Sequence, residues 1–218
     1  SNFWFKLPIL LLVFFGFYSA YKLGKSLYNS RVGLITTILT AFSVIYTLYS
    51  MDIHTDTILQ VFVTFSLWQL HEFIKTGKNR YWLSGFLGIG LAMLTKGPIG
   101  AVIPAFAVTG HLILKKNYRS FTDYRWYLGI LLSLLVVSPA LAGLVNQFGL
   151  QGLAFFFWEN NVGRLTGTYI QSTNDPFFVF HSLLYLFLPW SLLFYLVAFH
   201  EFRTLFRNKF HSNEYFTL

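Results

Sequence analysis

The chain consists largely of long apolar runs separated by short polar loops. A helix needs about 20 mostly apolar residues to cross the hydrocarbon core of a bilayer, and fewer when side chains at its ends reach the interface. By this measure the pattern predicts seven membrane-spanning helices. They are Phe5–Tyr21, Gly33–Ser50, Ile58–Ile74, Tyr81–Thr95, Ile99–Leu114, Trp126–Val145 and Phe177–His200. The fourth and fifth runs are short and close together, so a re-entrant pair is the alternative interpretation of those two.

Composition places this pattern in a membrane. The chain is 55% hydrophobic and only 11% charged, whereas about a quarter of the residues are charged in an ordinary soluble domain. So few ionic groups could not cover a water-soluble fold of 218 residues unless lipid replaced much of the solvent. We therefore predict an all-α, polytopic membrane helix bundle, with residues 1–218 forming a single transmembrane domain.

The sequence also excludes several classes of function. Because the chain has no cysteine, a disulfide framework, thiolate catalysis and Cys-based zinc sites are excluded. The H-E-x-x-H metal spacing, the P-loop and the G-x-G-x-x-G fingerprint do not occur in it, so nucleotide-driven chemistry has no support. The net charge of +8 would suggest nucleic acid for a soluble protein, but in a membrane protein basic residues set the orientation. We expect neither a nucleic-acid partner nor a metal site.

The basic residues are divided unevenly between the two sides of the predicted bundle. If alternate loops share a side, one side carries thirteen of the sixteen lysines and arginines. Basic loops remain in the cytoplasm, so this side is predicted to be cytoplasmic. The other side, which would face the periplasm, a lumen or the exterior, carries only Lys6, Lys96 and Arg164.

The ends of the sequence and its longest loop suggest how it is organised. The chain opens without a methionine, and its first span enters from the outer side. We therefore expect an internal fragment of a larger polytopic protein. A signal-peptide core is the alternative for the first span, but a basic n-region and a clear cleavage site are missing.

Residues 146–176 are predicted to form an outward-facing loop, in which the aromatic run Phe155–Trp158 indicates an interfacial helix.

Charged residues on the outer side are the candidates for chemistry. They are Asp52 and Asp56 before the third span, Lys96 between the fourth and fifth, and Glu159, Arg164 and Asp175 in the long loop. A charge at the centre of a membrane helix costs roughly 3 kcal/mol, so a polar site belongs at the ends of the bundle. Carboxylates and cations brought together there by antiparallel helices would suit an anion site with an acid or base beside it.

Each candidate also has a purely structural interpretation. Asp56 could cap a helix that begins near Thr57, because its carboxylate can accept backbone N–H bonds. Lys96 could reach the interface without a partner, or it could bind a phosphate or a carboxylate. Arg164 could pair with Glu159, five residues earlier, or lie at headgroup depth where a lipid phosphate would bind.

The histidines are weaker candidates. We interpret His54 as a solvated loop residue, and His111 and His181 as polar groups packed inside the bundle. His71 and Glu72 lie near the cytoplasmic end of their span, where they are expected to interact with neighbouring helices.

The middle of the chain resembles a family signature. The stretch Tyr81–Pro98 ends in G-L-A-M-L-T-K-G-P and is similar to the signature of the polyprenyl-phosphate-sugar-dependent GT-C glycosyltransferases, which include lipid A aminoarabinose transferases and protein O-mannosyltransferases. On its N-terminal side, Phe5-Lys6-Leu7-Pro8 resembles the family's R-L-P with Lys for Arg, and Thr55-Asp56 resembles its T-D-x-P loop without the proline. On its C-terminal side, Phe156–Arg164 resembles the F-F-W…N-x-x-R-F segment with Leu165 for Phe, and Pro176-Phe177-Phe178 with Leu188-Pro189-Trp190 resembles P-F-x-Y…L-P-W.

The resemblance implies a GT-C fold and an extracytoplasmic active site that uses a sugar on a polyprenyl phosphate. It implies that Asp56 is an acidic catalytic-site residue, and that Lys96 and Arg164 lie near the lipid phosphate. Apart from the resemblance, we expect Glu159, in the same outer loop as Arg164, to bind substrate as well. The family's principal catalytic Asp, the general base, would precede Ser1. No cofactor other than the lipid-linked donor is implied, and the role of a divalent ion is left open.

These observations lead to one main hypothesis and one alternative. The main hypothesis is an integral-membrane glycosyltransferase that transfers a sugar from a polyprenyl-phosphate donor to a lipid, glycan or protein acceptor. The short loops favour a bacterial inner membrane, with the site facing the periplasm or exterior. The alternative is a transporter or flippase for an anionic or lipid-linked substrate, which would predict inverted repeats and helices broken at mid-membrane. A structural subunit without a site would leave Lys96 and Arg164 unexplained.

Overall fold

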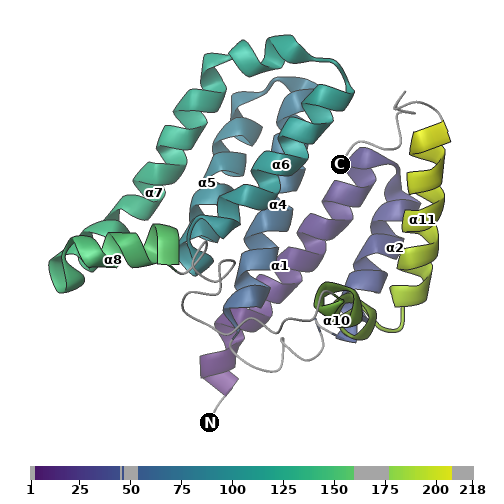
Figure 1. Ribbon diagram of the computed structural model, residues 1–218, viewed down its shortest axis with the longest axis horizontal. Helices are drawn as coiled ribbons and strands as arrows, with labels where there is room; N and C mark the ends of the chain where they lie inside the picture. The colour runs from purple at the N-terminus through teal and green to yellow at the C-terminus, as the bar shows by residue number, and fades with distance from the viewer. Residues whose placement is uncertain (1–2, 45, 47–53, 160–176, 208–218) are drawn as a thin grey trace.

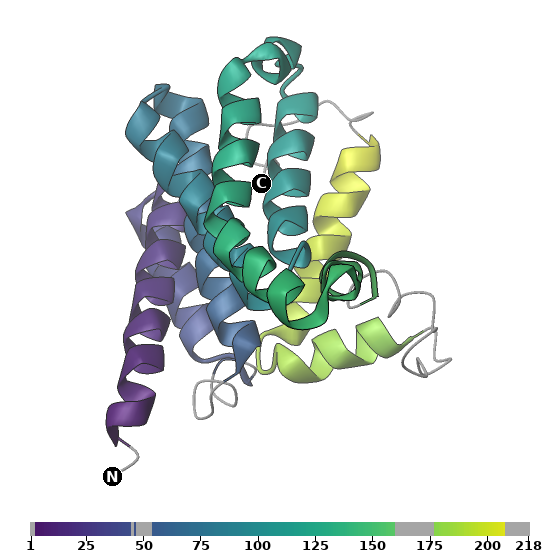
Figure 2. The ribbon, with the colours of Figure 1, turned by 90° about the vertical axis from the view of Figure 1, so that its left-hand side faces the viewer.

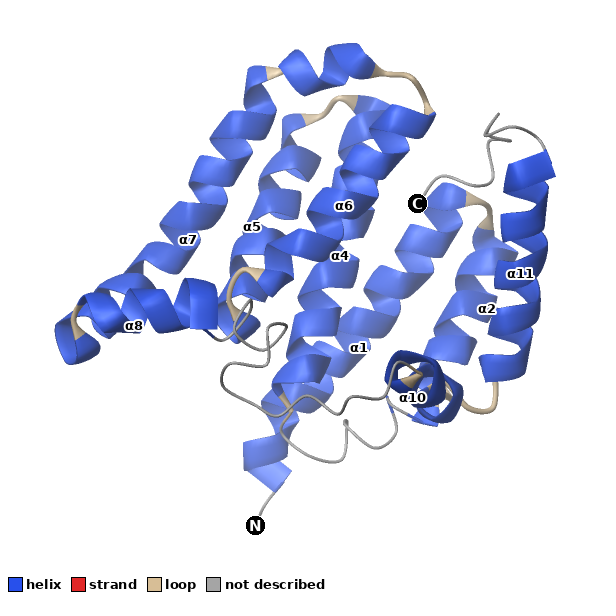
Figure 3. Ribbon diagram, viewed as in Figure 1, coloured by secondary structure: helices blue, strands red, loops and turns tan. Residues whose placement is uncertain are grey.

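The structure, a computed structural model, describes residues 3–44, 46, 54–159 and 177–207. Regular structure in this part of the chain is helical, and no strand occurs in it (Figure 3). The elements in chain order are α1 (Phe3–Leu27), α2 (Ser30–Ala41), α4 (Thr55–Thr76), α5 (Asn79–Lys96), α6 (Ile99–Leu114), η1 (Tyr118–Thr122), α7 (Tyr124–Phe148), α8 (Leu150–Ala154), η2 (Phe155–Glu159), α10 (Phe178–Leu186) and α11 (Ser191–Arg207). The predicted all-α class is confirmed for these residues.

Helices α4 and α5 form the centre of the bundle. Helix α4 packs against α1, α5 and α6, and α5 also packs against α6 and α7 (Figure 1). The largest buried apolar cluster joins α4, α5, α6 and α7, and consists of Leu70, Phe86, Ile89, Met93, Val108, Leu112 and Val137. Because lipid chains are as apolar as these side chains, close packing rather than removal from water would hold such helices together in a membrane.

Two helices are capped by side chains that the sequence places directly before them. The Oδ1 atom of Asn29 accepts hydrogen bonds from the backbone N–H groups of Arg31 and Val32, both at 3.0 Å, and so begins α2. The Oδ1 atom of Asp123 accepts one from the N–H of Arg125 at 3.0 Å and begins α7. Both residues satisfy N–H groups that have no partner inside the helix.

Arg125 connects the start of α7 to the rest of the bundle. Its Nη2 atom lies 2.7 Å from Asp123 Oδ2, and its Nη1 atom donates to the carbonyl of Gly77 at 3.1 Å and to Asn79 Oδ1 at 3.3 Å. The guanidinium also lies 4.8 Å from the centre of the Phe73 ring. The hydrogen bonds from Arg125 hold the pKa of the Asp123 carboxyl below its ordinary value, because they stabilise the ionised form.

The predicted number of membrane spans is only partly supported. Two of the described helices are long and apolar enough to cross a bilayer, over Lys6–Leu27 within α1 and over Tyr124–Phe148, which is all of α7. Two shorter apolar helices are Ser30–Ala41 and Ile99–Leu114. The seven-span arrangement therefore remains a prediction.

Two sequence-based interpretations in the C-terminal part are wrong. The run Phe177–His200, predicted to be one span, contains two helices, α10 and α11, with Pro189 between them. Proline lacks an N–H and its ring clashes with the preceding turn, so a continuous helix is broken there. His181, predicted to pack inside the bundle, is exposed, and its ring lies beside Phe177 and Phe180.

Helix α8 lies across one end of the bundle rather than along it. This is the end at which α4 begins and α5 turns into α6, at the bottom of Figure 1. Figure 2 shows that α10 crosses the same end. The predicted loop 146–176 is therefore partly helical, since α7 continues to Phe148 and is followed by α8 and η2. Its remaining residues, 160–176, lie outside the described part of the chain.

Candidate functional site

Asp56 lies in the first turn of α4. The helix begins at Thr55, with His54 in an extended conformation at the N-cap and without a side-chain capping bond from it. Asp56 is therefore inside the helix, and the interpretation of Asp56 as the cap of a helix beginning near Thr57 is wrong. A carboxylate in this turn is stabilised by the partial positive charge of the helix N-terminus.

Lys96 is the last residue of α5, and the two residues after it explain why the helix ends there. Gly97 has φ 75° and ψ −154°, a conformation that is readily accessible only to glycine. Its N–H donates to the carbonyl of Met93 at 2.7 Å. Pro98 occupies the N-cap of α6 with φ −53°, where its missing N–H costs no helical hydrogen bond. The K-G-P sequence thus produces a tight turn between two helices with a cation at its start.

Gly100 allows α5 and α6 to approach closely beside this turn. A Cβ atom at Gly100 would lie 2.4 Å from the carbonyl carbon of Ala92 and 2.6 Å from its oxygen. These are backbone atoms, which cannot move aside cheaply. The close approach fixes the direction in which α6 leaves the turn that follows Lys96.

The Lys96 Nζ atom and the Asp56 Oδ1 atom form an ion pair and a hydrogen bond. The two residues are 40 positions apart in the sequence, and they meet because α4 and α5 pack side by side. Their side chains are 46% exposed for Asp56 and 34% for Lys96, so the pair is accessible to a ligand. The structure thus brings together two of the residues that the sequence assigns to one site, Asp56 and Lys96, while Arg164 lies outside the described residues.

Glu159 lies elsewhere on the same end of the bundle. It is the last residue of η2, and with Phe148, Gln151 and Phe155 it lines a cavity of about 670 Å³ under the crossing helix α8. In the described residues no hydrogen bond or ion pair joins Glu159 to Asp56 or Lys96.

Three candidates from the sequence cannot be compared with the structure. Arg164, Asp52 and Asp175 lie outside the described residues. The site consists, in the described part, of the Asp56–Lys96 pair at the K-G-P turn.

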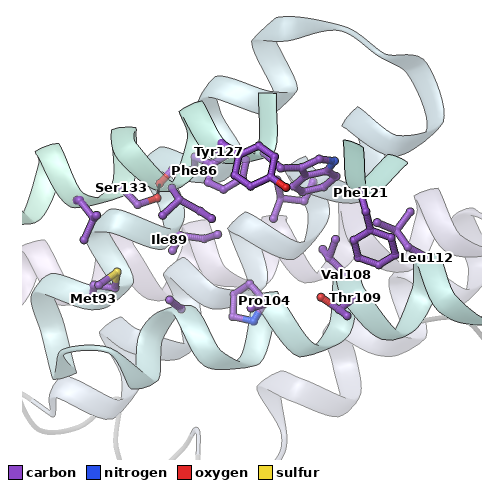
Figure 4. A pocket seen from close by; sticks show the side chains of 16 residues that line it. Phe86, Ile89, Met93, Pro104, Val108, Thr109, Leu112, Phe121, Tyr127 and Ser133 are labelled. Carbon is purple, nitrogen blue, oxygen red and sulfur yellow. Dashed lines mark hydrogen bonds between the residues drawn. The ribbon is translucent and has the colours of Figure 1, made fainter. Parts of the chain in front are cut away.

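An apolar cavity of about 360 Å³ begins close to this turn. Figure 4 shows side chains from α5, α6 and α7 around it, with Met93 toward one end and Phe121 and Leu112 toward the other. Met93 is three residues before Lys96, which is less than one helical turn. The cavity therefore extends from the region of the ion pair along the bundle toward its opposite end.

The cavity is open on the outer surface of the bundle. Tyr127, Ile130 and Leu134 of α7 line it and are themselves exposed. Since α7 is one of the two described helices apolar enough to span a membrane, this opening would face hydrocarbon. Ser133 also lines the cavity, but its hydroxyl donates to the carbonyl of Phe86 at 2.9 Å. The cavity is therefore suited to a hydrocarbon chain.

The sequence did not indicate this cavity. Ile89, Met93 and Val108 belong to the buried core as well as to the cavity lining. In the sequence they are apolar residues in apolar helices. Nothing in the sequence distinguishes a residue that packs in the core from one that lines a cavity. Gly100 and Pro104 within α6 are the local signals of unusual helix packing there.

The opposite end of the bundle carries a second group of polar residues. As predicted, Glu72 meets a neighbouring helix, because its Oε1 atom accepts a hydrogen bond from the Ser26 hydroxyl of α1. His71 and His111 lie with ring centres 6.0 Å apart, and His111 is buried as expected. This group is at the far end of α4 from Asp56 and is separate from the pair.

Comparison with known proteins identifies relatives of this chain. Residues 1–142 match the family described as dolichyl-phosphate-mannose-protein mannosyltransferase. An undecaprenyl phosphate-alpha-4-amino-4-deoxy-L-arabinose arabinosyl transferase of Pseudomonas aeruginosa is 29% identical over 178 residues, which cover 79% of this chain and 32% of that protein. The enzyme of the same name from Pseudomonas fluorescens is 27% identical over 180 residues, or 80% and 32% of the two chains.

An uncharacterized protein of Aquifex aeolicus is 28% identical over 197 residues, covering 87% of this chain and 37% of that protein. The chain thus spans about a third of the length of the curated relatives it matches. No solved structure matches it with significance.

Proposed function

The chain belongs to the dolichyl-phosphate-mannose-protein mannosyltransferase family, and from that premise we propose that it is part of a membrane glycosyltransferase that uses a polyprenyl-phosphate sugar as donor. The relatives named as undecaprenyl-phosphate aminoarabinose transferases support this donor class. The resemblance found in the sequence, to GT-C glycosyltransferases, agrees with the family match.

One structural observation carries the proposal. The Asp56–Lys96 ion pair lies at the K-G-P turn, within one turn of helix from Met93 in the lining of the apolar cavity. A polyprenyl phosphate has an anionic head and a long hydrocarbon tail. The Lys96 ammonium matches the head, and the cavity, open toward hydrocarbon along α7, matches the first part of the tail.

The chemistry of sugar transfer explains why a cation is needed at this position. When the bond between the anomeric carbon and the phosphate oxygen breaks, negative charge builds up on the leaving prenyl phosphate. A fixed ammonium group beside that oxygen stabilises the transition state more than the ground state. Asp56 would hold the Lys96 side chain in place and present a carboxylate to hydroxyl groups of the sugar or acceptor.

The remaining candidates complete the proposed site. Arg164 would provide a second cation for the phosphate, and Glu159 would contact substrate from η2. The segment 146–176 would form an outward-facing loop, with its aromatic residues at the membrane interface. The distribution of basic residues supports a site that faces the periplasm or exterior of a bacterial inner membrane, with a lipid, glycan or protein as acceptor.

The proposal is tested by measuring donor consumption. The intact purified protein in detergent is incubated with undecaprenyl-phosphate-linked 4-amino-4-deoxyarabinose and a lipid A acceptor, and release of undecaprenyl phosphate is followed by mass spectrometry. We expect release by the wild type, and a strong decrease for Lys96→Ala and for Arg164→Ala. The matched control is Lys78→Ala, which removes an exposed lysine from the opposite end of α5.

Two outcomes count against the proposal, the first against the site and the second against the function. Undiminished release by both variants would remove Lys96 and Arg164 from the site. Binding of the donor without any release, by an intact protein supplied with several lipid, glycan and peptide acceptors, would favour the transporter alternative instead.

A further inference from the structure

A polar cavity of about 360 Å³ lies at the end of the bundle opposite the Asp56–Lys96 pair. It lies between the C-terminal ends of α1, α4 and α6, and its polar lining comes from Ser26, His71, Lys75, His111, Lys115 and Asn117. A water molecule needs about 10–15 Å³ of such space, which is far less than this cavity offers. It has room for a ligand group together with bound water.

Two lysines in the lining of this cavity have no acidic partner in the described part of the chain. Neither Lys75 nor Lys115 has an ion-pair partner among the described residues, and both side chains are exposed. The Nδ1 atom of His71 is buried and makes no hydrogen bond with any described residue. A buried ring nitrogen of this kind is ordinarily satisfied by a neighbouring polar group or by bound water.

The charge around the cavity is positive. Twelve of the described lysines and arginines lie at this end of the bundle, namely Lys22, Lys25, Arg31, Lys75, Lys78, Arg80, Lys115, Lys116, Arg119, Arg125, Arg203 and Arg207. The acidic residues described there are Glu72, which accepts a hydrogen bond from Ser26, Asp123, which is paired with Arg125, and Glu201, whose Oε1 atom lies 3.8 Å from His200 Nδ1.

The simplest structural role of the two lysines accounts for only part of this arrangement. The C-termini of α4 and α6 carry partial negative charges of about half an electron each, and Lys75 and Lys115 lie in position to stabilise them. That role explains a lysine at each helix end. It does not explain the polar cavity that lies between the two lysines and that His71 and His111 also line.

We propose that this cavity binds a phosphate group, supplied either by the headgroup of an anionic phospholipid or by a soluble phosphate compound. The Lys75 and Lys115 ammonium groups donate to the phosphate oxygens, and charge-assisted bonds of this kind are stronger than neutral ones. Basic pockets between membrane helices on the positively charged side are suited to lipid headgroups. This site is distinct from the proposed sugar-transfer site and does not depend on it.

The test compares two double variants of the intact protein. Lys75→Gln with Lys115→Gln removes both charges from the cavity, and Lys25→Gln with Lys78→Gln removes two charges from the same end of the bundle without changing the lining. Retention of added phosphatidylglycerol by each purified protein is measured by native mass spectrometry. Diacylglycerol, which lacks the phosphate, is the control ligand.

We expect phosphatidylglycerol to bind at least about tenfold more weakly to the cavity variant, because two charge-assisted hydrogen bonds are replaced by weaker neutral ones. The control variant should bind within about twofold of the wild type, since its charges are screened by solvent. Equal weakening of both variants, or retention of diacylglycerol equal to that of phosphatidylglycerol, would overturn the proposal. Because the replaced side chains are exposed, the unfolding temperature of each variant should match that of the wild type.

A competition experiment distinguishes the two sources of phosphate. Inorganic phosphate is added to the phosphatidylglycerol complex, with chloride at matched ionic strength as the control. Displacement of the lipid by phosphate but not by chloride supports the site with a soluble phosphate as ligand. Retention of the lipid in both salts, combined with weaker binding by the cavity variant, supports it with a lipid headgroup as ligand.

Discussion

The ion pairs Asp56–Lys96 and Asp123–Arg125 lie at opposite ends of the bundle and differ in what surrounds them. Arg125 pairs with a residue two positions away and also contacts Gly77, Asn79 and Phe73. Lys96 pairs with a residue 40 positions away, and no further hydrogen bond from its ammonium is made to a described residue.

This difference suggests different roles for the two cations. The guanidinium of Arg125 contacts several protein groups, which is typical of a residue with a structural role. The ammonium of Lys96 has donors remaining beyond its single carboxylate partner, since it carries three N–H groups, and it lies beside the apolar cavity. A partly exposed pair of this kind contributes little stability, about 0–1 kcal/mol, so its position at the turn is better explained by binding.

The largest predicted effect distinguishes these roles directly. Lys96→Ala should reduce donor turnover about 100-fold or more, because one electrostatic donor to the developing charge is lost, and should leave the unfolding temperature almost unchanged. Arg125→Ala should lower the unfolding temperature, while the folded fraction retains its turnover. Turnover and thermal unfolding are measured on the same preparations in detergent. If Lys96→Ala unfolds the protein as readily as Arg125→Ala, the distinction is wrong.

The next effect concerns the turn that positions Lys96. Gly100→Ala should destabilise the protein by about 1–3 kcal/mol, because its Cβ would overlap the Ala92 backbone. A Cβ atom at Gly110, in the same helix, would have nothing within 4 Å of it, so Gly110→Ala should be neutral or stabilising by up to about 1 kcal/mol. Denaturant unfolding in detergent measures both. Equal effects of the two substitutions would exclude a close approach of α5 and α6 at Gly100.

The site can be predicted from the sequence only as far as local signals reach. Lys96 stands out because it lies between two apolar runs on the less basic side, and Gly97-Pro98 predicts a tight turn after it. The sequence alone does not decide whether Lys96 binds a phosphate or a carboxylate. The partner found, Asp56, depends on the packing of α4 against α5, which no sequence spacing encodes.

The fold shows the same limit. The helical class follows from the apolar runs. The end of α5 and the beginning of α6 follow from Gly97 and Pro98. Hydropathy is continuous across Pro189 and so conceals the break between α10 and α11, although proline is itself a helix-breaking signal. Hydropathy alone therefore overestimates the length of this last run.

A smaller effect is expected at the N-cap of α7. Asp123→Ala removes the acceptor for the Arg125 N–H and should cost about 1 kcal/mol of stability. Asp123→Asn should retain most of that stability, because asparagine is an equally good N-cap. Thermal unfolding of the two variants measures the difference. A loss as large for Asn as for Ala would show that the charge, rather than the cap, is what Asp123 provides.

The smallest effect is the pH dependence that arises from the charge of Asp123 alone. Because Arg125 holds the pKa of this carboxyl below its ordinary value in the folded protein, the unfolded chain binds the proton more readily. The stabilisation is therefore fully present above the unfolded pKa, about 3.9, and is lost as the pH falls through the lower, folded pKa. The wild type should lose stability relative to Asp123→Asn, which cannot titrate, as the pH is lowered from 7 to 3.

Because the pair is accessible to solvent, 0.5 M NaCl should reduce the difference. A difference in unfolding temperature that stays constant over this pH range would mean that Arg125 does not stabilise the ionised carboxylate, and the Asp123–Arg125 pair would then be reduced to a backbone cap and a packing contact.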